Sequence, residues 1–323
     1  MFGTIVVDWD IPFLAGVFEN WFDVRYLAGR EITADDVREA VALVVRTRTR
    51  CNATLLEGSS VRLIATATIG TDHIDLPFCA TRGITVASAP GCNAAAVAQY
   101  VAVALHALDL DHPGRMLGII GVGHVGTKVA EAARRAGLRV LLNDPPRAAA
   151  EGPAAFTPLP ALLAQSDIVT LHIPLWPENR DFADAAFFAA MKPGASFINA
   201  SRGEVLDEES LLAARGRLDK VVLDVWKHEP DINRALLAAA DIATPHIAGY
   251  SIQGKINGTK AVVRAVGETF GIVPLQQFEI REVDLPEEPY DIFADDTALR
   301  REPGAFESLR SNYRYRDDRL MPF

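Results

Sequence analysis

Short apolar runs separated by helical patterns make up most of this chain. In the N-terminal part these runs predict β-strands at residues 4–8, 42–46, 61–66 and 83–87. Between them, residues 33–41 predict a helix, with Thr33 as its N-cap. Strands that alternate with helices are typical of a parallel sheet covered by helices on its faces.

The same alternation resumes after a long helix. Asn93 is a good N-cap for an apolar helix over residues 94–108, which ends in a polar turn. The stretch 145–160 is rich in Pro, Gly and Ala and predicts loops, whereas residues 251–272 predict one more helix. Apolar runs in this part predict strands at 116–121, 139–144, 168–172, 196–199, 221–225 and 242–244.

A glycine-rich turn follows the strand predicted at 116–121. Gly121, Gly123 and Gly126 form a Gly-x-Gly-x-x-Gly pattern that passes directly into helix-forming sequence, and Asp144 ends the next apolar run. This is the context that a dinucleotide-binding turn requires: the glycines permit a tight turn, close approach of a pyrophosphate and close packing of the helix on the sheet. The N–H groups of the helix N-terminus then face the phosphates.

We therefore expect an α/β protein with two doubly wound parallel-sheet domains. Residues 95–249 are expected to form a Rossmann-type NAD-binding domain. Residues 1–94 and 250–272 are expected to form a flavodoxin-like substrate-binding domain. Residues 273–323 are acidic, then basic, with several prolines and few periodic apolar positions, so we expect an extension that is either disordered or packed on a partner.

Composition excludes several classes of protein. The net charge of −10 argues against broad nucleic-acid binding, although local arginines can still bind a small anion. Cys51, Cys79 and Cys92 lack the spacing of a disulfide framework or a zinc site, and no metal is expected. Because the chain contains neither a membrane-length apolar run nor a basic leader before its first strand, we expect a cytoplasmic protein without a membrane partner.

Three polar residues follow predicted strands and could carry out chemistry on a hydroxy or keto acid. Arg202 has the planar fork that binds a carboxylate, although taken alone it could be an arginine in a surface turn. His246 is a candidate acid or base, the alternative being a core histidine with its hydrogen bonds satisfied. Glu229 could hold the imidazole in one tautomer, but the sequence does not show that Glu229 and His246 touch.

Further polar residues could serve the cofactor or the substrate. Asp144 is placed to accept from the adenosine ribose, which favours NAD over NADP, although Arg147 lies nearby. Asp224 ends a strand and could accept from the nicotinamide carboxamide, or act only as a cap. The loops 45–49 and 65–75 carry hydroxyls and could line a substrate cleft, or serve as capping loops.

Four motifs together resemble the D-isomer-specific 2-hydroxyacid dehydrogenases. They are Gly-Val-Gly-His-Val-Gly (121–126), Asn-Ala-Ser-Arg-Gly (199–203), Leu-Asp-Val-Trp-Lys-His-Glu-Pro (223–230) and Pro-His-Ile-Ala-Gly-Tyr (245–250). The resemblance implies that Arg202 and Glu229 are catalytic and that His246 is the proton donor or acceptor. It implies substrate contacts from Thr47, Thr68 and Tyr250. Around NAD it implies His124, Val125, Asp144, Ala200, Ser201, Arg202, Asp224 and Gly249.

Further stretches, at 68–75, 89–94, 143–147 and 247–255, narrow the resemblance to one group within the family. That group acts on a phosphorylated hydroxy acid and dimerises through a longer C-terminal domain, so a homodimer is implied. Segments 290–292 and 309–313 resemble the start of that domain, after which the chain stops. Ile173 replaces a hydroxyl residue that many relatives place beside the cofactor. The alternatives are a different acid, such as 3-phosphoglycerate or a hydroxypyruvate, or a non-catalytic NAD-sensing scaffold.

Overall fold

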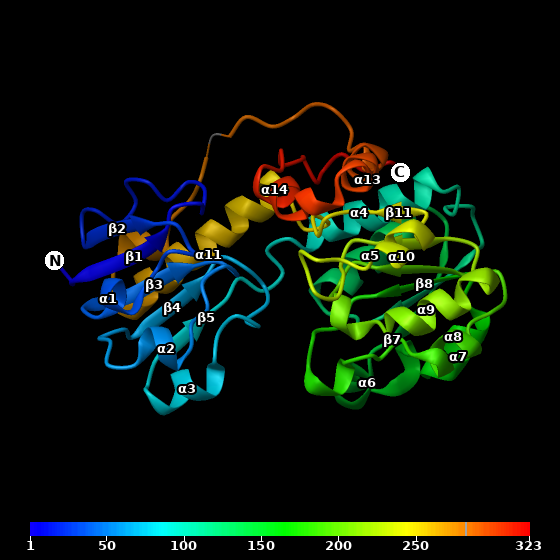
Figure 1. The fold of residues 1–323 in the computed structure, drawn as a ribbon, viewed down its shortest axis with the longest axis horizontal. Helices are drawn as coiled ribbons and strands as arrows, with labels where there is room; N and C mark the ends of the chain where they lie inside the picture. Colours follow the sequence, from blue (N-terminus) through cyan, green and yellow to red (C-terminus); the bar gives the residue numbers. More distant parts are fainter. Residues whose placement is uncertain (282) are drawn as a thin grey trace. The chain divides into compact units, whose positions relative to one another are not determined.

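The computed structural model describes residues 1–281 and 283–323, which divide into two compact units (Figure 1). Unit 1 consists of Met1–Asn93 and Ile252–Leu285, and unit 2 of Ala94–Ser251 and Pro286–Phe323. Each unit contains one parallel sheet, so the predicted α/β class with two parallel-sheet domains is confirmed. Within the described residues, no helix combines the length and apolar character needed to cross a membrane.

The sheet of unit 1 has the strand order β2-β1-β3-β4-β5, which is the flavodoxin-like order. Its strands are β1 (Thr4–Asp8), β2 (Asp23–Leu27), β3 (Ala40–Val45), β4 (Leu63–Thr66) and β5 (Thr85–Ala87). The sequence analysis did not predict β2. It is an edge strand with no fully buried residue, and its charged residues Asp23 and Arg25 break the apolar run by which the other strands were found.

The helices of unit 1 pack on both faces of this sheet. They are α1 (Ala34–Val37), α2 (Ala53–Leu56), α3 (Leu76–Thr81), α11 (Ile252–Phe270) and α12 (Val273–Gln276). The predicted helix 33–41 is shorter than expected, because β3 begins at Ala40. Helix α11 packs against β4, and a Cβ added at Gly258 would lie 2.9 Å from the carbonyl oxygen of Ala67, so this position requires a glycine for close approach.

The sheet of unit 2 has the order β11-β10-β9-β8-β6-β7. Its strands are β6 (Met116–Ile120), β7 (Arg139–Asn143), β8 (Ile168–Leu171), β9 (Ser196–Asn199), β10 (Val221–Leu223) and β11 (Ile242–Ala243). Strand β6 pairs with β7 on one side and with β8 on the other, so the strand order reverses there. Ligands of open α/β sheets bind at the carboxyl ends of the strands at such a switch point.

Helices cover both faces of the second sheet. They are α4 (Ala94–Ala107), α5 (His124–Arg135), α6 (Pro145–Glu151), α7 (Leu159–Gln165), α8 (Ala185–Ala190), α9 (Glu208–Ala214) and α10 (Arg234–Ala239). The prediction of loops over 145–160 is wrong for α6. There Asp144 caps the N-terminus, prolines fill the first turn and alanines continue the helix.

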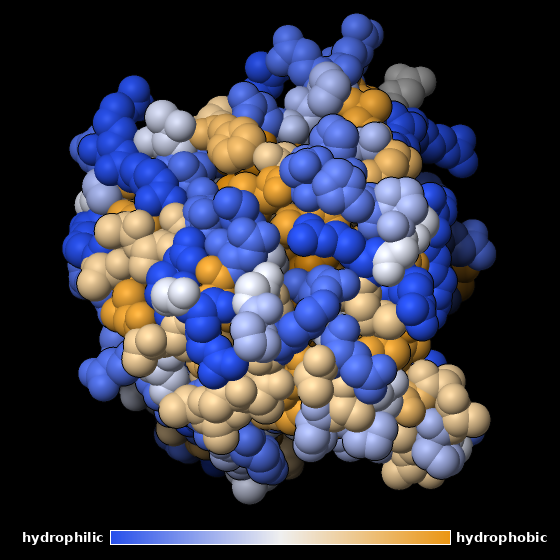
Figure 2. All heavy atoms as spheres, turned by 90° about the vertical axis from the view of Figure 1, so that its right-hand side faces the viewer, coloured by the Kyte–Doolittle hydropathy of each residue, from blue (hydrophilic) through white to orange (hydrophobic). Residues whose placement is uncertain are grey.

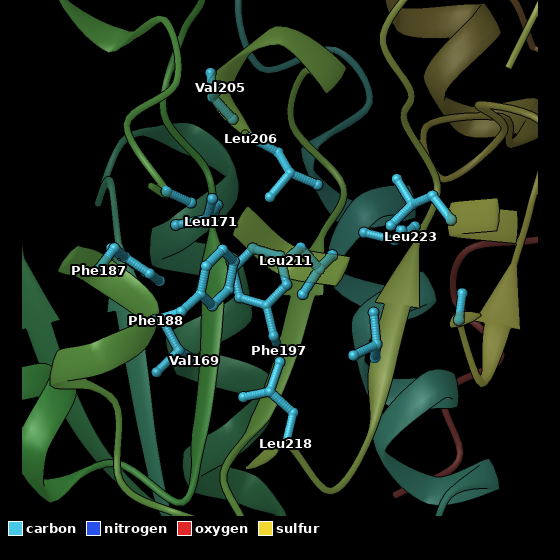
Figure 3. Packing of buried hydrophobic residues seen from close by; sticks show 14 of the residues in the cluster. Val169, Leu171, Phe187, Phe188, Phe197, Val205, Leu206, Leu211, Leu218 and Leu223 are labelled. Carbon is cyan, nitrogen blue, oxygen red and sulfur yellow. The ribbon is translucent and has the colours of Figure 1, made fainter. Parts of the chain in front are cut away.

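The core of unit 2 lies on the two faces of its sheet. On one face, Phe187, Phe188 and Phe197 pack edge to face, with centroids 5.4 Å apart for the first two and 5.2 Å for the last two (Figure 3). The other face is covered by α4 and α5. On the face of the molecule drawn in Figure 2, hydrophilic residues predominate and hydrophobic residues form separate patches.

Residues 286–323 of the C-terminal extension pack on unit 2 of the same chain, which neither alternative from the sequence included. Helices α13 (Ile292–Arg301) and α14 (Phe306–Ser311) bury Ile292, Leu299 and Phe306 almost completely. Ile292 and Leu299 lie seven residues apart on α13, a helical spacing that the surrounding prolines and charges obscured, and Phe306 is the first residue of α14. Helix α13 lies along the edge strand β11 (Figure 1), where the Asp296 carboxylate accepts from the Ala243 N–H at 2.7 Å.

Substitution Leu299→Ala tests whether the extension is part of the unit 2 core. Because Leu299 is fully buried, we expect the free energy of unfolding of unit 2 to fall by about 2–5 kcal/mol. Phe293→Ala is the matched control, since Phe293 lies on the same helix but is 46% exposed. Urea unfolding followed by circular dichroism measures both, and equal losses in the two variants would contradict this packing.

Candidate active site

Three neighbouring strands of unit 2 end in the loops that carry the predicted catalytic residues. Arg202 follows β9, Glu229 follows β10 and His246 follows β11. Strand β10 pairs in parallel with both β9 and β11, so the three loops leave the same edge of the sheet. Parallel pairing therefore gathers residues that are far apart in the sequence.

Glu229 and His246 are in direct contact. The Nδ1 atom of His246 lies 2.8 Å from Oε2 and 3.0 Å from Oε1 of Glu229. An ionised carboxylate only accepts hydrogen bonds, so Nδ1 carries the proton and Nε2 of the neutral ring is left as the acceptor. The sequence alone could not show this contact.

The protein holds Glu229 in its ionised form. Oε1 of Glu229 also accepts from the Trp226 N–H at 3.1 Å, and Nη1 of Arg310 lies 3.5 Å from Oε2. Burial by itself favours the neutral acid, but the hydrogen bond from His246, the charge that this imidazole carries when protonated and the charge of Arg310 outweigh it and hold the pKa of Glu229 below its usual value. The carboxylate is therefore a permanent negative partner for the imidazole.

Close backbone packing connects the Arg202 loop to the Glu229 loop. A Cβ added at Gly203 would lie 2.0 Å from the carbonyl carbon of Trp226, so only glycine fits there. Asn199 closes the Arg202 loop, because its side chain accepts from the N–H of Ser201 at 3.1 Å and donates to the carbonyl oxygen of Arg202 at 3.0 Å. The guanidinium of Arg202 donates to the carbonyl oxygen of Ser201 at 2.8 Å.

The loop after His246 is held by two buried charged residues. The Asp224 carboxylate accepts from the N–H groups of Ile247 and Ala248 at 2.8 and 2.9 Å. The Arg316 guanidinium donates to the carbonyl oxygens of the same two residues, at 3.0 Å for Ile247. His246 itself has φ +57°, a conformation that costs an ordinary residue about 1 kcal/mol or more and persists where neighbouring contacts fix it.

Asp224 thus has a structural task that its position in the sequence did not reveal. It is 1% exposed, and Thr244 also donates to it at 2.6 Å. Burial raises the pKa of Asp224 above its usual value, while these donors favour the charged form. Its predicted contact with the nicotinamide stays a prediction.

The glycine-rich turn has the geometry of a dinucleotide cradle. Gly121 has φ +85°, and a Cβ there would lie 2.5 Å from the carbonyl oxygen of His172. A Cβ at Gly126 would lie 2.0 Å from the carbonyl oxygen of Gly121, whereas Gly123 faces open space. The turn leads into the first residues of α5, His124 and Val125.

Groups around this turn fit NAD. Asp144 accepts from the Val122 N–H at 2.8 Å, which brings its carboxylate to the turn. Arg147 is engaged by Glu151 at 2.7 Å and by the Val122 carbonyl oxygen at 2.6 Å. Burial lowers the pKa of His172 to about 3, and its buried Nδ1 has no hydrogen-bond partner within residues 1–281 and 283–323. The backbone of His172 lies against Gly121, so this unpaired buried atom belongs to a residue next to the cradle.

The predicted substrate residues belong to both units. Thr47 and Thr68 lie in unit 1, where Thr47 is exposed and the Thr68 hydroxyl donates to the carbonyl oxygen of Gly70 at 3.2 Å. Arg46, next to Thr47, is held by Asp8 at 2.9 Å. In unit 2, the half-buried Tyr250 follows the His246 loop directly. The predicted cofactor residues Ala200, Ser201 and Gly249 lie in the loops after β9 and β11.

Sequence reasoning missed the contribution of the C-terminal extension to this site. Arg310 and Arg316 both lie in that segment, and their partners are residues of the loops that carry the predicted catalytic residues. The apolar residues at 292, 299 and 306 could have indicated that the segment packs on a core, but they would not have identified the arginines.

Comparison with known proteins agrees with the fold and the motifs. Residues 97–248 match the family model "D-isomer specific 2-hydroxyacid dehydrogenase, NAD binding domain". The erythronate-4-phosphate dehydrogenase of Bacteroides fragilis is 43% identical, over 96% of this chain and 95% of that protein. That of Chromohalobacter salexigens is 47% identical, over 83% of this chain and 73% of that protein.

A solved structure, the TT0316 protein from Thermus thermophilus, is 28% identical with a TM-score of 0.68, over 83% of this chain and 97% of that chain. The match to the Bacteroides protein leaves only 5% of it uncovered, so that relative has no long C-terminal domain outside the match. The group to which stretches 68–75 and 247–255 pointed is that of the erythronate-4-phosphate dehydrogenases, and the predicted resemblance is confirmed. The chain belongs to the D-isomer-specific 2-hydroxyacid dehydrogenase family.

Proposed function

We propose that this chain oxidises 4-phospho-D-erythronate at C2 to 2-oxo-3-hydroxy-4-phosphobutanoate, with NAD as its cofactor. This is a reaction of pyridoxine 5′-phosphate synthesis. The observation that carries the proposal is the contact of 2.8 Å between Nδ1 of His246 and the Glu229 carboxylate, at the carboxyl ends of parallel strands, where open α/β sheets bind their ligands. The names of its relatives support the choice of acid.

The roles of the residues follow from the geometry. Glu229 holds the Nδ1 proton, so Nε2 of His246 is the base that takes the proton of the C2 hydroxyl. The negative charge of Glu229 then stabilises the imidazolium that forms. Arg202, at the end of the neighbouring strand, binds the substrate carboxylate and polarises the carbonyl as it forms.

NAD, when bound, supplies the hydride acceptor. The turn of Gly121, Gly123 and Gly126 would hold its pyrophosphate at the N-terminus of α5. Asp144 would accept from the adenosine ribose. Arg147 is the group that could favour a 2′-phosphate, but its guanidinium forms an ion pair with Glu151 and donates a hydrogen bond to the carbonyl oxygen of Val122.

A substrate panel separates this proposal from the alternatives. We expect NADH formation to be fastest with 4-phospho-D-erythronate and at least about tenfold slower in kcat/KM with D-3-phosphoglycerate, since the two acids differ in chain length. A preference for 3-phosphoglycerate would overturn the choice of acid while keeping the chemistry. NAD binding without turnover on any hydroxy acid would favour the sensing scaffold, which has no need of the His246–Glu229 pair.

Replacement of the proposed base tests the mechanism. We expect His246→Gln to lower kcat by about a hundredfold or more, because glutamine cannot take up the hydroxyl proton. NAD binding, measured by quenching of tryptophan fluorescence, should survive because the glycine turn is untouched. His106→Gln is the control, since His106 is exposed and paired with Asp111 at 2.8 Å. If kcat of His246→Gln equalled that of His106→Gln, His246 would not be the base and the proposed mechanism would be refuted.

Asp144 is the expected determinant of cofactor choice. We expect Asp144→Ser to lower the ratio of kcat/KM for NAD over NADP by about tenfold or more, because the serine does not repel a 2′-phosphate. Asp184→Ser is the matched control, because Asp184 also caps a helix, accepting from the Phe187 N–H at 2.9 Å. If both variants kept the wild-type ratio of kcat/KM for NAD over NADP, Asp144 would not be the residue that selects NAD through its ribose.

The homodimer and the cytoplasmic location that we expected from the sequence stay predictions. Light scattering on the purified protein measures the dimer, which we expect at twice the chain mass of 35.0 kDa. A mass of 35.0 kDa at micromolar concentration would contradict it.

A further inference from the structure

We propose that Arg310, from the C-terminal extension, is a positioning residue of the acid–base pair, and that it sets the pH range in which His246 acts as a base. This inference rests on the proposed function of the pair. It assigns to the extension a role in the reaction itself, in addition to covering the edge of the sheet.

The geometry places one cation against the catalytic carboxylate. Nη1 of Arg310 lies 3.5 Å from Oε2 of Glu229, the oxygen that contacts His246 at 2.8 Å. Both side chains of this ion pair are 17% exposed, so water screens the interaction only in part. Arg310 also interacts with the hydroxyl of Tyr250, the predicted substrate contact that follows the catalytic loop.

The extension fixes Arg310 in this place. Arg310 lies on α14, whose Phe306 is fully buried in the unit 2 core. The guanidinium carbon lies 5.9 Å from the centre of the Phe306 ring, and Nη1 lies 3.7 Å from a carboxylate oxygen of Glu307. Phe306 and Glu307 therefore hold the side chain of Arg310 beside Glu229.

The charges around the His246–Glu229 pair determine whether Arg310 raises or lowers the pH at which the pair releases its proton. Asp224 faces His246 from the end of β10, and Glu229 faces it from the loop beyond. Arg310 faces Glu229, and Tyr250 and Glu307 face Arg310. A cation beside Glu229 weakens the field that holds a proton on the imidazole, so the pair releases that proton at a lower pH.

Removal of the Arg310 charge should therefore make the pair hold its proton to higher pH. In Arg310→Gln we expect the acid limb of the kcat/KM profile for hydroxy-acid oxidation to move up by about half to one pH unit. At pH values above the limb, kcat/KM should return to within about twofold of the wild type. Arg310→Lys, which restores the charge, should return the limb toward its original place.

Two controls separate this role from a structural one. Arg301→Gln removes an exposed arginine of the same extension and should leave the limb unmoved. The Cε1–H resonance of His246, assigned through His246→Gln in protein labelled at histidine, follows the proton on the ring without turnover. It should titrate higher in Arg310→Gln by about the same half to one unit, even if the acid proves to be a different one.

An unshifted titration of the His246 ring in folded Arg310→Gln would overturn the proposal. So would a loss of kcat/KM that is equal at every pH and that lysine does not restore, because a structural defect has that signature. If Arg310→Gln does not fold, Arg310→Lys tests the proposal. An acid limb of the kcat/KM profile within about 0.3 pH units of the wild type supports the role of the positive charge, and a limb that moves as far as expected for Arg310→Gln refutes it.

Discussion

Two buried charged residues hold the backbone that carries the proposed base, and the active site depends on them. The Asp224 carboxylate accepts hydrogen bonds from the N–H groups of Ile247 and Ala248, and the Arg316 guanidinium donates hydrogen bonds to the carbonyl oxygens of the same residues. All four polar groups of this short segment are thereby satisfied inside the protein. Loss of either charged residue would leave buried backbone groups of Ile247 and Ala248 without a hydrogen-bond partner, which typically costs about 1–3 kcal/mol for each group.

This clamp explains why a histidine with φ +57° can be kept in place. The backbone on its C-terminal side cannot relax without breaking bonds to both Asp224 and Arg316, so the ring stays directed at Glu229. Glu229 is itself fixed through the Trp226 N–H, and the Trp226 backbone packs against Gly203 beside Arg202. The three strand ends therefore form one connected structure rather than three independent loops.

Sequence patterns indicate buried elements of this fold better than exposed ones. Strands such as β6 and β8, buried on both sides, were found because almost all of their residues are apolar. The edge strand β2 was missed because charged residues interrupt it, and α6 was missed because alanines and prolines were taken as loop residues. The glycine turn could be predicted because Gly121 and Gly126 occupy positions where a side chain would clash, a local requirement that is the same in any protein with this turn.

By itself, the sequence determined the α/β class with two parallel-sheet domains, the glycine turn with its acidic partner, and the residue types that could move a proton. These are local properties, set by periodicity, backbone conformation and side-chain chemistry. Only the tertiary structure decided that His246 contacts Glu229 and that Asp224 and Arg316 both bind the backbone of Ile247 and Ala248. It also decided that residues 286–323 pack on unit 2 of the same chain. Each of these contacts joins segments distant along the chain, and their geometry follows from strand order and packing, which no short window of sequence encodes.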